Sequence, residues 1–183
     1  NKSALHLVGL VSEGLIHSSD AHAHALLDLA KEHKFKDVYV HAILDGRDTN
    51  KDAAIDFVTN LQAKMKDVKI GKIASLSGRF YAMDRNKSWD RTEAAFRAMV
   101  DGQSAASFDD PVEAVKASYA KEVFDEQFVP TVITHRKKPV AKIKDKDAVI
   151  FFNYRPDRAR QLTRSFVLPD FDKFQRKYFT NLF

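Results

Sequence analysis

The chain has 183 residues, a length that fits one or two domains and a core that needs no covalent cross-link. It contains no cysteine, which excludes disulfide bonds and thiolate-bound metals, and we expect a cytoplasmic protein. No apolar run approaches the ~20 residues of a membrane span, and the first residues show no signal-peptide pattern. The net charge of +5 is a mild excess, and most lysines are mixed with acidic residues. This pattern favours an anionic small molecule as partner over nucleic acid.

Short apolar runs alternate with helical patterns over the first hundred residues. The runs ALHLVGL, VYVHAIL and IGKIASL are typical of buried strands. Between them, apolar residues recur at the spacing of one helix face, and Asp20 is expected to cap the first of these helices. We expect strands over 4–10, 38–44 and 70–76, helices from Asp20 to about Ala30, from Ala54 to Met65 and from Ala94 to Val100, and a polar loop from Gly78 to about Asp90.

The remaining segments are less regular. Asp110-Pro111 is typical of a helix start. The pieces VITH and VAKI around the turn RKKP predict a hairpin between Pro130 and Lys144, and AVIFFNY predicts a central strand. A helix is expected from Pro156 through Phe166, and KYFTNLF, at 177–183, predicts a last strand. The chain is therefore predicted to form a single α/β domain over 1–183: a mostly parallel sheet with helices on both faces and a small β-hairpin excursion.

Arginines follow several of the strand-like runs. Arg47 follows VYVHAILDG, Arg79 and Arg85 follow IASLSG, and Arg155 and Arg158 follow AVIFFNY. Open α/β sheets bind ligands at the carboxyl ends of their strands, and the guanidinium fork matches carboxylate and phosphate oxygens. If these charges lie ~8 Å apart, each pair repels by roughly 2 kcal/mol at an effective dielectric near 20, so convergence would indicate a bound anion. The alternative is that they stay apart and pair locally with Asp48, Asp84, Asp90 and Asp157.

Two further polar residues are candidates for proton chemistry. His17 lies on the loop after the first strand, where a histidine can donate to an anion or move a proton near neutral pH. Asp48 adjoins Arg47 in LDGRD, which favours its ionised form, and such a carboxylate can orient or deprotonate a substrate hydroxyl. An ordinary loop histidine and a local surface ion pair are the respective alternatives.

The other histidines, and the absence of known catalytic motifs from the sequence, do not indicate a catalytic or metal site in this chain. His41 lies inside a strand and is expected in the core. Asp20, His22 and His24 follow one another at intervals of two positions. On a helix this spacing points the side chains in different directions, so it does not predict a metal site. The sequence contains no nucleophile elbow, phosphate-binding glycine loop or paired-histidine zinc motif. The sequence therefore favours binding over independent catalysis.

Long motifs of this chain resemble a known family. The strings LSGRFYAMDRNKSWDRTEAAFRAMVDG, HAILDGRD and FNYRPDRARQL are similar to the cofactor-independent (2,3-bisphosphoglycerate-independent) phosphoglycerate mutases, from about Leu5 onward. The part that matches is the family's substrate-binding, or phosphotransferase, domain, which is inserted into an alkaline-phosphatase-like domain. The resemblance implies that the serine that becomes phosphorylated and two divalent metals, usually Mn²⁺, belong to that other domain. The chain begins at Asn1, as an excised piece would, and is expected to be inactive alone and to bind no cofactor itself.

The resemblance also implies a reaction and residue roles. The whole enzyme would interconvert 3-phosphoglycerate and 2-phosphoglycerate through a phosphoserine on the missing domain, while this domain holds the glycerate. His17, Arg47 and Asp48 resemble residues at the glycerate, and Asp48 with His17 would handle the hydroxyl proton. The arginines that resemble those holding the carboxylate and phosphate are Arg79, Arg85, Arg155 and Arg158. The implied partners are the two phosphoglycerates and the missing domain, with no nucleic acid and no membrane.

The loop before His17 departs from the family pattern. The family's first motif usually reads S-D-G-G-V-H-S-H, whereas this chain reads S-E-G-L-I-H-S-S. Leu15 replaces a glycine, so any positive φ required there would be strained, and the loop is expected to differ in shape. Since the chain lacks the family's serine and metal ligands, a non-catalytic phosphate- or carboxylate-binding module is an alternative. A nucleic-acid-binding domain is a further one, and it predicts a steep salt dependence of affinity.

Overall fold

A computed structural model describes residues 3–183, which form one seven-stranded sheet in the order β4-β5-β3-β2-β1-β7, with β6 paired to β5. The parallel strands are β1 (Leu5–Leu10), β2 (Val38–Leu44), β3 (Lys72–Gly78) and β7 (Ala148–Phe151). The others are β4 (Ser107–Phe108), β5 (Thr131–His135), which is antiparallel to β3, and β6 (Lys138–Pro139). The predicted, mostly parallel sheet is thus confirmed.

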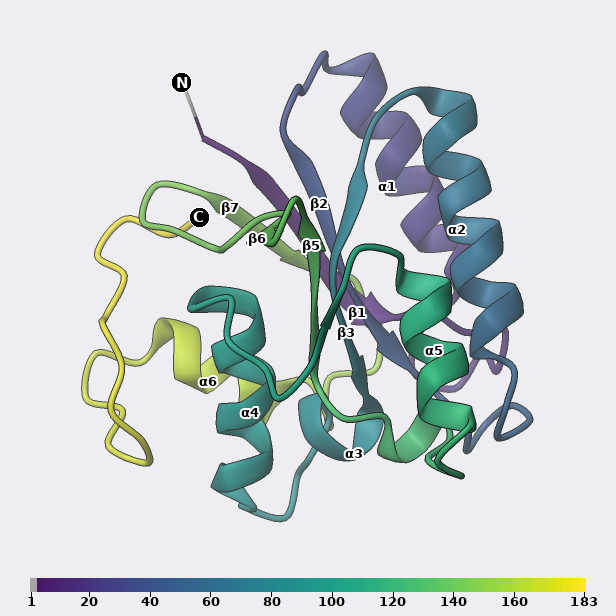
Figure 1. Cartoon of the computed structure of the whole chain (residues 1–183). Helices are drawn as coiled ribbons and strands as arrows, with labels where there is room; N and C mark the ends of the chain where they lie inside the picture. The colour runs from purple at the N-terminus through teal and green to yellow at the C-terminus, as the bar shows by residue number, and fades with distance from the viewer. Residues whose placement is uncertain (1–2) are drawn as a thin grey trace.

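Helices cover both faces of the sheet, as predicted (Figure 1). One face carries α1 (Asp20–Glu32), α2 (Ala54–Val68) and α5 (Pro111–Tyr119), and the other carries α3 (Arg79–Ala82), α4 (Trp89–Val100) and α6 (Arg160–Val167). Leu5 and Leu7 of β1 enter the first core, whereas Val8 and Leu10 enter the second. Because both faces are buried, the central strands read as nearly continuous apolar runs. Within residues 3–183, the helices are too short or too polar to cross a membrane.

Local sequence signals explain where some helices begin. The Asp110 carboxylate accepts the N–H groups of Val112 and Glu113 at 2.8 and 3.0 Å, and Pro111 occupies the first turn of α5. The start of α2 has a distant cap: Asp125 accepts the Ala54 N–H at 2.8 Å. At α1, Asp20 is the first helical residue rather than the predicted cap, and Ser19 holds the N-cap position. Sequence spacing predicts local caps but not the one supplied from position 125.

Several predicted elements differ from the structure. The polar loop after β3 contains the short helix α3. The hairpin is confirmed, but its second strand is β6, at the end of the turn, rather than VAKI at 140–143. AVIFFNY forms only the four residues of β7, which lies at the edge of the sheet, so its prediction as a central strand is wrong.

The C-terminal segment KYFTNLF is irregular rather than a strand. It still runs along β7, because the Phe183 N–H donates to the Asp147 carbonyl at 3.0 Å and the Val149 N–H donates to the Phe183 carbonyl at 2.7 Å. Phe179 of this segment is buried in the second core. The apolar residues therefore serve packing, without the backbone ladder that a strand would need.

Candidate functional site

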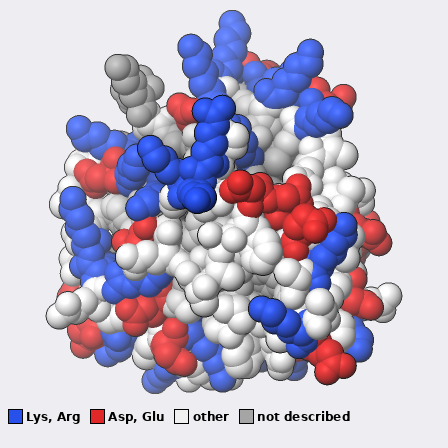
Figure 2. Space-filling view, in the orientation of Figure 1, with Lys and Arg blue, Asp and Glu red and all other residues white. Residues whose placement is uncertain are grey.

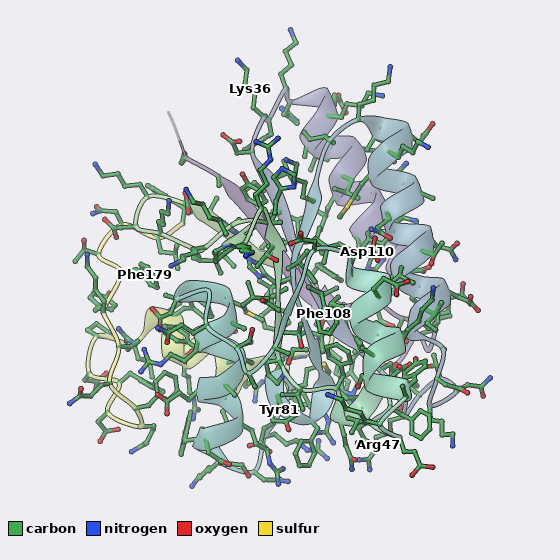
Figure 3. All side chains as sticks on the ribbon, viewed as in Figure 1. Lys36, Arg47, Tyr81, Phe108, Asp110 and Phe179 are labelled. Atoms are coloured by element: carbon green, nitrogen blue, oxygen red, sulfur yellow. The ribbon has the colours of Figure 1, made fainter. Side chains whose placement is uncertain are left out.

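The candidate site lies where the parallel strands end. Loops from the carboxyl ends of β1, β2 and β7 and the helix α3 that follows β3 meet at this edge of the sheet. Figure 3 labels Arg47 at this lower end of the molecule and Lys36 at the opposite end. Because parallel strands share one carboxyl edge, residues distant in sequence are brought together here.

Asp45 is a buried carboxylate that ties several predicted site residues together. Its Oδ1 accepts hydrogen bonds from Arg79 Nη1 at 2.6 Å and from the backbone N–H groups of Arg47 and Asp48 at 3.2 and 3.0 Å. Its Oδ2 accepts the Ser12 hydroxyl at 2.5 Å. Burial alone would raise the pKa of Asp45, but these hydrogen bonds outweigh it and the pKa is lowered. Asp45 is thus an ionised anchor for the start of the LDGRD loop.

Arg79 is the most buried of the candidate arginines, at 3 % exposure. Its Nη1 donates both to Asp45 and to Asp48 Oδ2, each at 2.6 Å. Burial opposes the charge of Arg79, but the hydrogen bonds from its guanidinium to the two carboxylates raise its pKa. The Asp48 carboxylate is therefore held in place by a guanidinium that is itself fixed by Asp45.

A second carboxylate, Asp157, lies between Arg85 and Arg155. Arg85 Nη1 donates to Asp157 Oδ2 at 2.6 Å, and Arg155 Nη2 donates to the same oxygen at 3.3 Å. Arg155 Nε lies 2.9 Å from Asp157 Oδ1. Burial would raise the pKa of Asp157, but the charge of Arg155 and the other cationic neighbours lower it. Unlike Arg79, both arginines are about half exposed, at 47 % and 48 % of their side chains.

His17 is 3 % exposed and faces this cluster. Its Nδ1 lies 3.6 Å from Asp157 Oδ1, and this buried nitrogen has no hydrogen-bond partner among residues 3–183. Burial lowers the pKa of His17, and the charge of Arg79 lowers it further, so the ring is neutral near pH 7. The His17 carbonyl accepts the Arg155 N–H at 3.3 Å, which ties the two loops together. Since buried polar atoms are normally paired, the free Nδ1 indicates a position for a ligand atom.

Arg158 and Arg47 complete the positive cluster. Arg158 Nη1 donates to the Met83 carbonyl at 3.3 Å. Burial lowers the pKa of Arg158, and the nearby charges that lower it further belong to Arg85, Arg79 and Arg47. The Arg158 guanidinium therefore lies within electrostatic reach of these three arginines.

The exposed Arg47 is held from a segment that the sequence analysis did not connect to the site. Arg47 Nη1 donates to Glu126 Oε1 at 3.2 Å. Glu126 belongs to η1 (Asp125–Gln127), a 3-10 turn that packs closely on Gly46. Gly46 has φ +65°, and a Cβ there would lie 2.7 Å from the Glu126 nitrogen, so both space and backbone conformation require glycine.

The loop before His17 has the positive φ at position 15 that was expected to be strained for a leucine. Leu15 has φ +53°, a left-handed conformation that glycine adopts without penalty. Gly14 packs against the site, since a Cβ there would lie 2.8 Å from Asp48 Cβ. Despite the substitution at position 15, the loop therefore still brings His17 to the cluster.

The candidate arginines lie at one edge of the sheet, and several of them also pair with nearby aspartates. The arginines share one edge of the sheet, yet Asp48 and Asp157 pair with them there. Asp84 takes a different partner, with Oδ1 3.7 Å from Arg91 Nη1. Sequence reasoning did not assign a role to Asp45, although its position directly after a buried strand was a usable signal. It also treated Asp157 only as a local partner for an arginine.

Another hollow lies at the opposite end of the sheet. A groove of about 800 Å³ at the amino end of the sheet is lined by Lys36, Lys66, Lys69 and Lys72, which we call the lysine groove. Figure 2 shows Lys and Arg side chains gathered on the upper part of the molecule, the end where Figure 3 labels Lys36. A second hollow of about 630 Å³, lined by Gly14 and Asp48 among others, adjoins the arginine cluster.

A chain of buried polar side chains runs across neighbouring strands, from β3 through β2 and β1 to Asp147 before β7. Ser75 Oγ lies 2.8 Å from His41 Nδ1, and His41 Nε2 lies 3.0 Å from His6 Nδ1. His6 Nε2 lies 3.3 Å from Asp147 Oδ2. Two neutral rings satisfy every contact if Ser75 donates to His41, His41 to His6 and His6 to Asp147. The prediction that His41 is a core residue is confirmed, since it is 0 % exposed.

Metal ligation finds no support in this part of the protein. Among residues 3–183, no three His, Asp or Glu side chains are grouped so that they could hold a metal ion. Asp20, His22 and His24 lie on or at the start of α1 and form no such group either. The residues present therefore do not fit the divalent metals that the family resemblance implies for the whole protein.

Comparison with known proteins gives consistent matches over this chain. The family model described as "BPG-independent PGAM N-terminus (iPGM_N)" matches residues 1–183. A 2,3-bisphosphoglycerate-independent phosphoglycerate mutase of Lachnoclostridium phytofermentans is 51 % identical over 177 residues, which are 97 % of this chain and 34 % of that protein. The protein of the same name from Listeria welshimeri is 51 % identical over 176 residues, covering 96 % and 34 %.

A solved structure extends the match to three dimensions. The crystal structure of Leishmania mexicana phosphoglycerate mutase at low cobalt concentration superposes with a TM-score of 0.94 at 33 % identity. The superposition covers 100 % of this chain and 35 % of that one. The chain therefore spans about a third of the length of the curated relatives it matches.

Proposed function

The chain belongs to the BPG-independent phosphoglycerate mutase family, as its N-terminal domain, and on this premise we propose that it binds 2- and 3-phosphoglycerate at the arginine cluster. The observation that carries the proposal is that the buried Nδ1 of His17, which has no hydrogen-bond partner among residues 3–183, lies within electrostatic reach of Arg79 and Arg155. Phosphoglycerate carries a carboxylate and a phosphate, and both are anions that arginine binds through paired hydrogen bonds. Charge-assisted hydrogen bonds of about 1.5–3 kcal/mol each would offset the repulsion within the cluster.

The donors divide into a fixed and an adjustable set. Arg79 is buried and tied to Asp45 and Asp48, so it keeps one orientation whether or not substrate is present. Arg85 and Arg155 are half exposed, so their side chains can turn toward a phosphate or carboxylate. In this proposal the fixed set positions the glycerate and the adjustable set closes on its charged groups, which is where a phosphoryl-transfer enzyme obtains most of its advantage.

Asp48 and His17 are the groups proposed to handle the proton of the substrate hydroxyl. The Asp48 carboxylate is oriented by Arg79 at 2.6 Å and remains partly exposed to a ligand. The neutral His17 ring can accept or donate at Nδ1, which forms no hydrogen bond with the described residues and lies 3.6 Å from Asp157 Oδ1. A base held beside the hydroxyl, and a second group that hydrogen-bonds the same oxygen, suit the alternate presentation of two neighbouring hydroxyls.

The remainder of the protein is proposed to supply the phosphoryl chemistry. In the full-length protein the phosphoryl group would pass from the substrate oxygen to a serine outside this chain and return to the other hydroxyl. Because the described residues form no metal-binding group, we assign the two divalent cations, Mn²⁺ by family resemblance, to that remainder. The cations would neutralise charge on the phosphoryl group there. The isolated chain is therefore expected to bind phosphoglycerate weakly and to have no mutase activity.

Arg155→Ala in the full-length protein tests the proposal. We expect kcat/KM for 3-phosphoglycerate to fall by about 100-fold or more, because an arginine that contacts the reacting anion contributes about 3 kcal/mol. The matched control is Arg164→Ala on α6, an exposed arginine that forms no ion pair within residues 3–183 and should change kcat/KM less than twofold. Near-normal turnover of Arg155→Ala would refute the assignment. A full-length reading frame without the serine and metal motifs would instead favour a non-catalytic binding module.

A further inference from the structure

Asp157 occupies the position in the arginine cluster that a bound anion would take. One of its oxygens accepts from Arg85 at 2.6 Å and from Arg155 at 3.3 Å. The other lies 2.9 Å from Arg155 Nε and 3.6 Å from His17 Nδ1. Both carboxylate oxygens thus face cationic or polar groups that the proposed function assigns to the substrate. The arrangement is the one that a substrate carboxylate would adopt in the same place.

We propose that Asp157 is an internal counter-anion that competes with the substrate for Arg85 and Arg155 and is displaced when phosphoglycerate binds. This inference rests on the proposed function, because it names the competitor at the same site. When no substrate is bound, Asp157 offsets part of the positive charge of the two guanidinium groups and keeps them beside His17. When substrate binds, its anionic group takes over these donors and the Asp157 side chain turns away.

The surroundings of Asp157 suit displacement rather than permanent pairing. Its side chain is 29 % exposed and its two arginine partners are about half exposed, so water reaches these side chains, whereas the Oδ1 atom of Asp157 is buried. Exposed ion pairs contribute little to stability for that reason. Asp157 also lies only two residues from Arg155 on the loop that follows β7, so a local change in that loop separates the pair.

The pair Asp45–Arg79 in the same site is buried, unlike the partly exposed pairs of Asp157. Asp45 is 1 % exposed, Arg79 is 3 % exposed, and the carboxylate also binds backbone N–H groups. Removing a partner from such a buried pair leaves an uncompensated charge, so this pair is not exchangeable. The cluster therefore contains one carboxylate that positions its arginine and one that competes for it.

Asp157→Asn in the full-length protein separates competition from positioning. The substitution keeps the shape of the side chain and removes the charge that holds the arginines. If Asp157 competes, the Kd of 3-phosphoglycerate and of inorganic phosphate, measured by calorimetry, should fall by about three- to tenfold. If Asp157 instead positions the arginines for substrate, both values should rise. Unchanged or weaker binding overturns the inference.

The matched control is Glu13→Gln. Glu13 lies on the loop after β1 at the same edge of the sheet and forms no ion pair within residues 3–183. The substitution makes the same change in net charge without releasing an arginine, so the Kd values should change less than about twofold. An equal gain in both variants would indicate a general effect of net charge and would overturn the specific role of Asp157.

A double-variant cycle gives a readout that a structural role would not produce. In an Arg85→Ala background, Asp157→Asn should improve phosphate binding less than it does in the unmodified protein, because one contested donor is gone. Asp157→Ser serves as a second variant if Asn perturbs folding, which thermal unfolding would reveal. If Arg155→Ala loses no affinity, the proposed function fails. If Arg155→Ala loses affinity but Asp157→Asn gains none, only the present inference fails.

Discussion

The arginine cluster and the lysine groove are two positively charged regions at opposite ends of one sheet. The lysine groove is the larger hollow, at about 800 Å³. The side chains of the arginine cluster are held by buried or half-buried carboxylates beside a buried histidine nitrogen that has no hydrogen-bond partner among residues 3–183. The comparison teaches that ordered donors, rather than the size of a hollow or the number of charges, mark the candidate site.

The lysines have local reasons for their positions. Lys66 lies in the last turn of α2, where a cation interacts favourably with the helix dipole. Lys69 is the C-cap of that helix, with φ +60°. Lysine is a strongly hydrated point charge on a flexible stem, whereas the arginine guanidinium has a fixed fork of donors. Two of the four lysines of the groove, Lys66 and Lys69, therefore have their positions explained by the end of α2.

The largest expected effect comes from Arg79→Lys, which keeps the charge at the arginine cluster and removes the fork. Arg79 contacts Asp45 and Asp48 through the single nitrogen Nη1, whereas a lysine ammonium ends one bond nearer the backbone and brings no further nitrogen for an anion. We expect kcat/KM of the full-length protein to fall by 100- to 1,000-fold, equivalent to about 3–4 kcal/mol. Arg97→Lys is the control, since Arg97 is paired to Glu93 and Asp101 on α4. An equal loss of kcat/KM in both variants would contradict the view that the ordered donors of Arg79, and not only its charge, are needed.

Asp45→Asn should have the next largest effect, because it removes the anchor of the cluster. An amide accepts only at its oxygen, so with that oxygen facing Arg79 its NH₂ group would replace the acceptor of the Ser12 hydroxyl, and the negative charge beside Arg79 would be lost. We expect the free energy of unfolding to fall by about 2–3 kcal/mol, measured by urea denaturation, with kcat reduced more than KM. Asp28→Asn, which breaks an exposed pair with Lys64, should cost under about 0.5 kcal/mol. A small loss at Asp45 would mean that the cluster orders itself without it.

A change of pH from 7 to 5 should affect the buried histidines of the sheet and the arginine cluster differently. Burial, and then the proximity of His6, lower the pKa of His41 well below 6.5. Unfolded His41 gains a proton below pH 6.5 and folded His41 does not, so stability falls as the pH decreases, by at most about 2 kcal/mol at pH 5. Burial lowers the pKa of His6 as well, although Asp147 opposes this.

One buried carboxyl works against this pH dependence. Burial raises the pKa of Asp125 to about 6, although hydrogen bonds from Tyr119 and the start of α2 oppose that rise. Folded Asp125 therefore takes up a proton between pH 7 and 5 and stabilises the fold there by about 1.4 kcal/mol. His41→Gln should flatten the loss of stability on acidification, and Asp125→Asn should steepen it, both measured by urea denaturation at each pH. Parallel pH profiles in the wild type and His41→Gln would contradict the buried-histidine account.

The arginine cluster itself should remain intact over the same pH range. The pKa values of Asp45 and Asp157 are lowered, so both carboxylates stay ionised at pH 5.

The smallest expected effect belongs to the lysine groove. Lys66→Gln combined with Lys72→Gln should change kcat/KM of the full-length protein less than twofold and its free energy of unfolding by under about 0.5 kcal/mol. Both side chains are exposed at the amino end of the sheet, away from the arginine cluster. A large loss of activity would show that the lysine groove is a second functional site.

The sequence predicted the architecture because local pattern and burial agree over most of the chain. The runs that became β1, β2 and β3 are buried on both faces, and the spacing of apolar residues in α2 and α4 is regular. The prediction of a last strand at 177–183 was wrong, since an apolar run is equally compatible with packing against a core. The position of β7 at the edge also could not be predicted, because strand order depends on pairing between distant segments.

The sequence by itself determined the residue types of the candidate site and their places after the strands, because arginine after a buried run is visible in the chain. The tertiary structure alone decided which carboxylates meet these arginines. Asp45 and Arg79 are 34 positions apart, and Arg85 and Asp157 are 72 positions apart. Their contacts depend on parallel strand order and loop packing, which create distances and burial that no local pattern encodes. For the same reason, the free Nδ1 of His17 and the competing position of Asp157 became visible only in the folded protein.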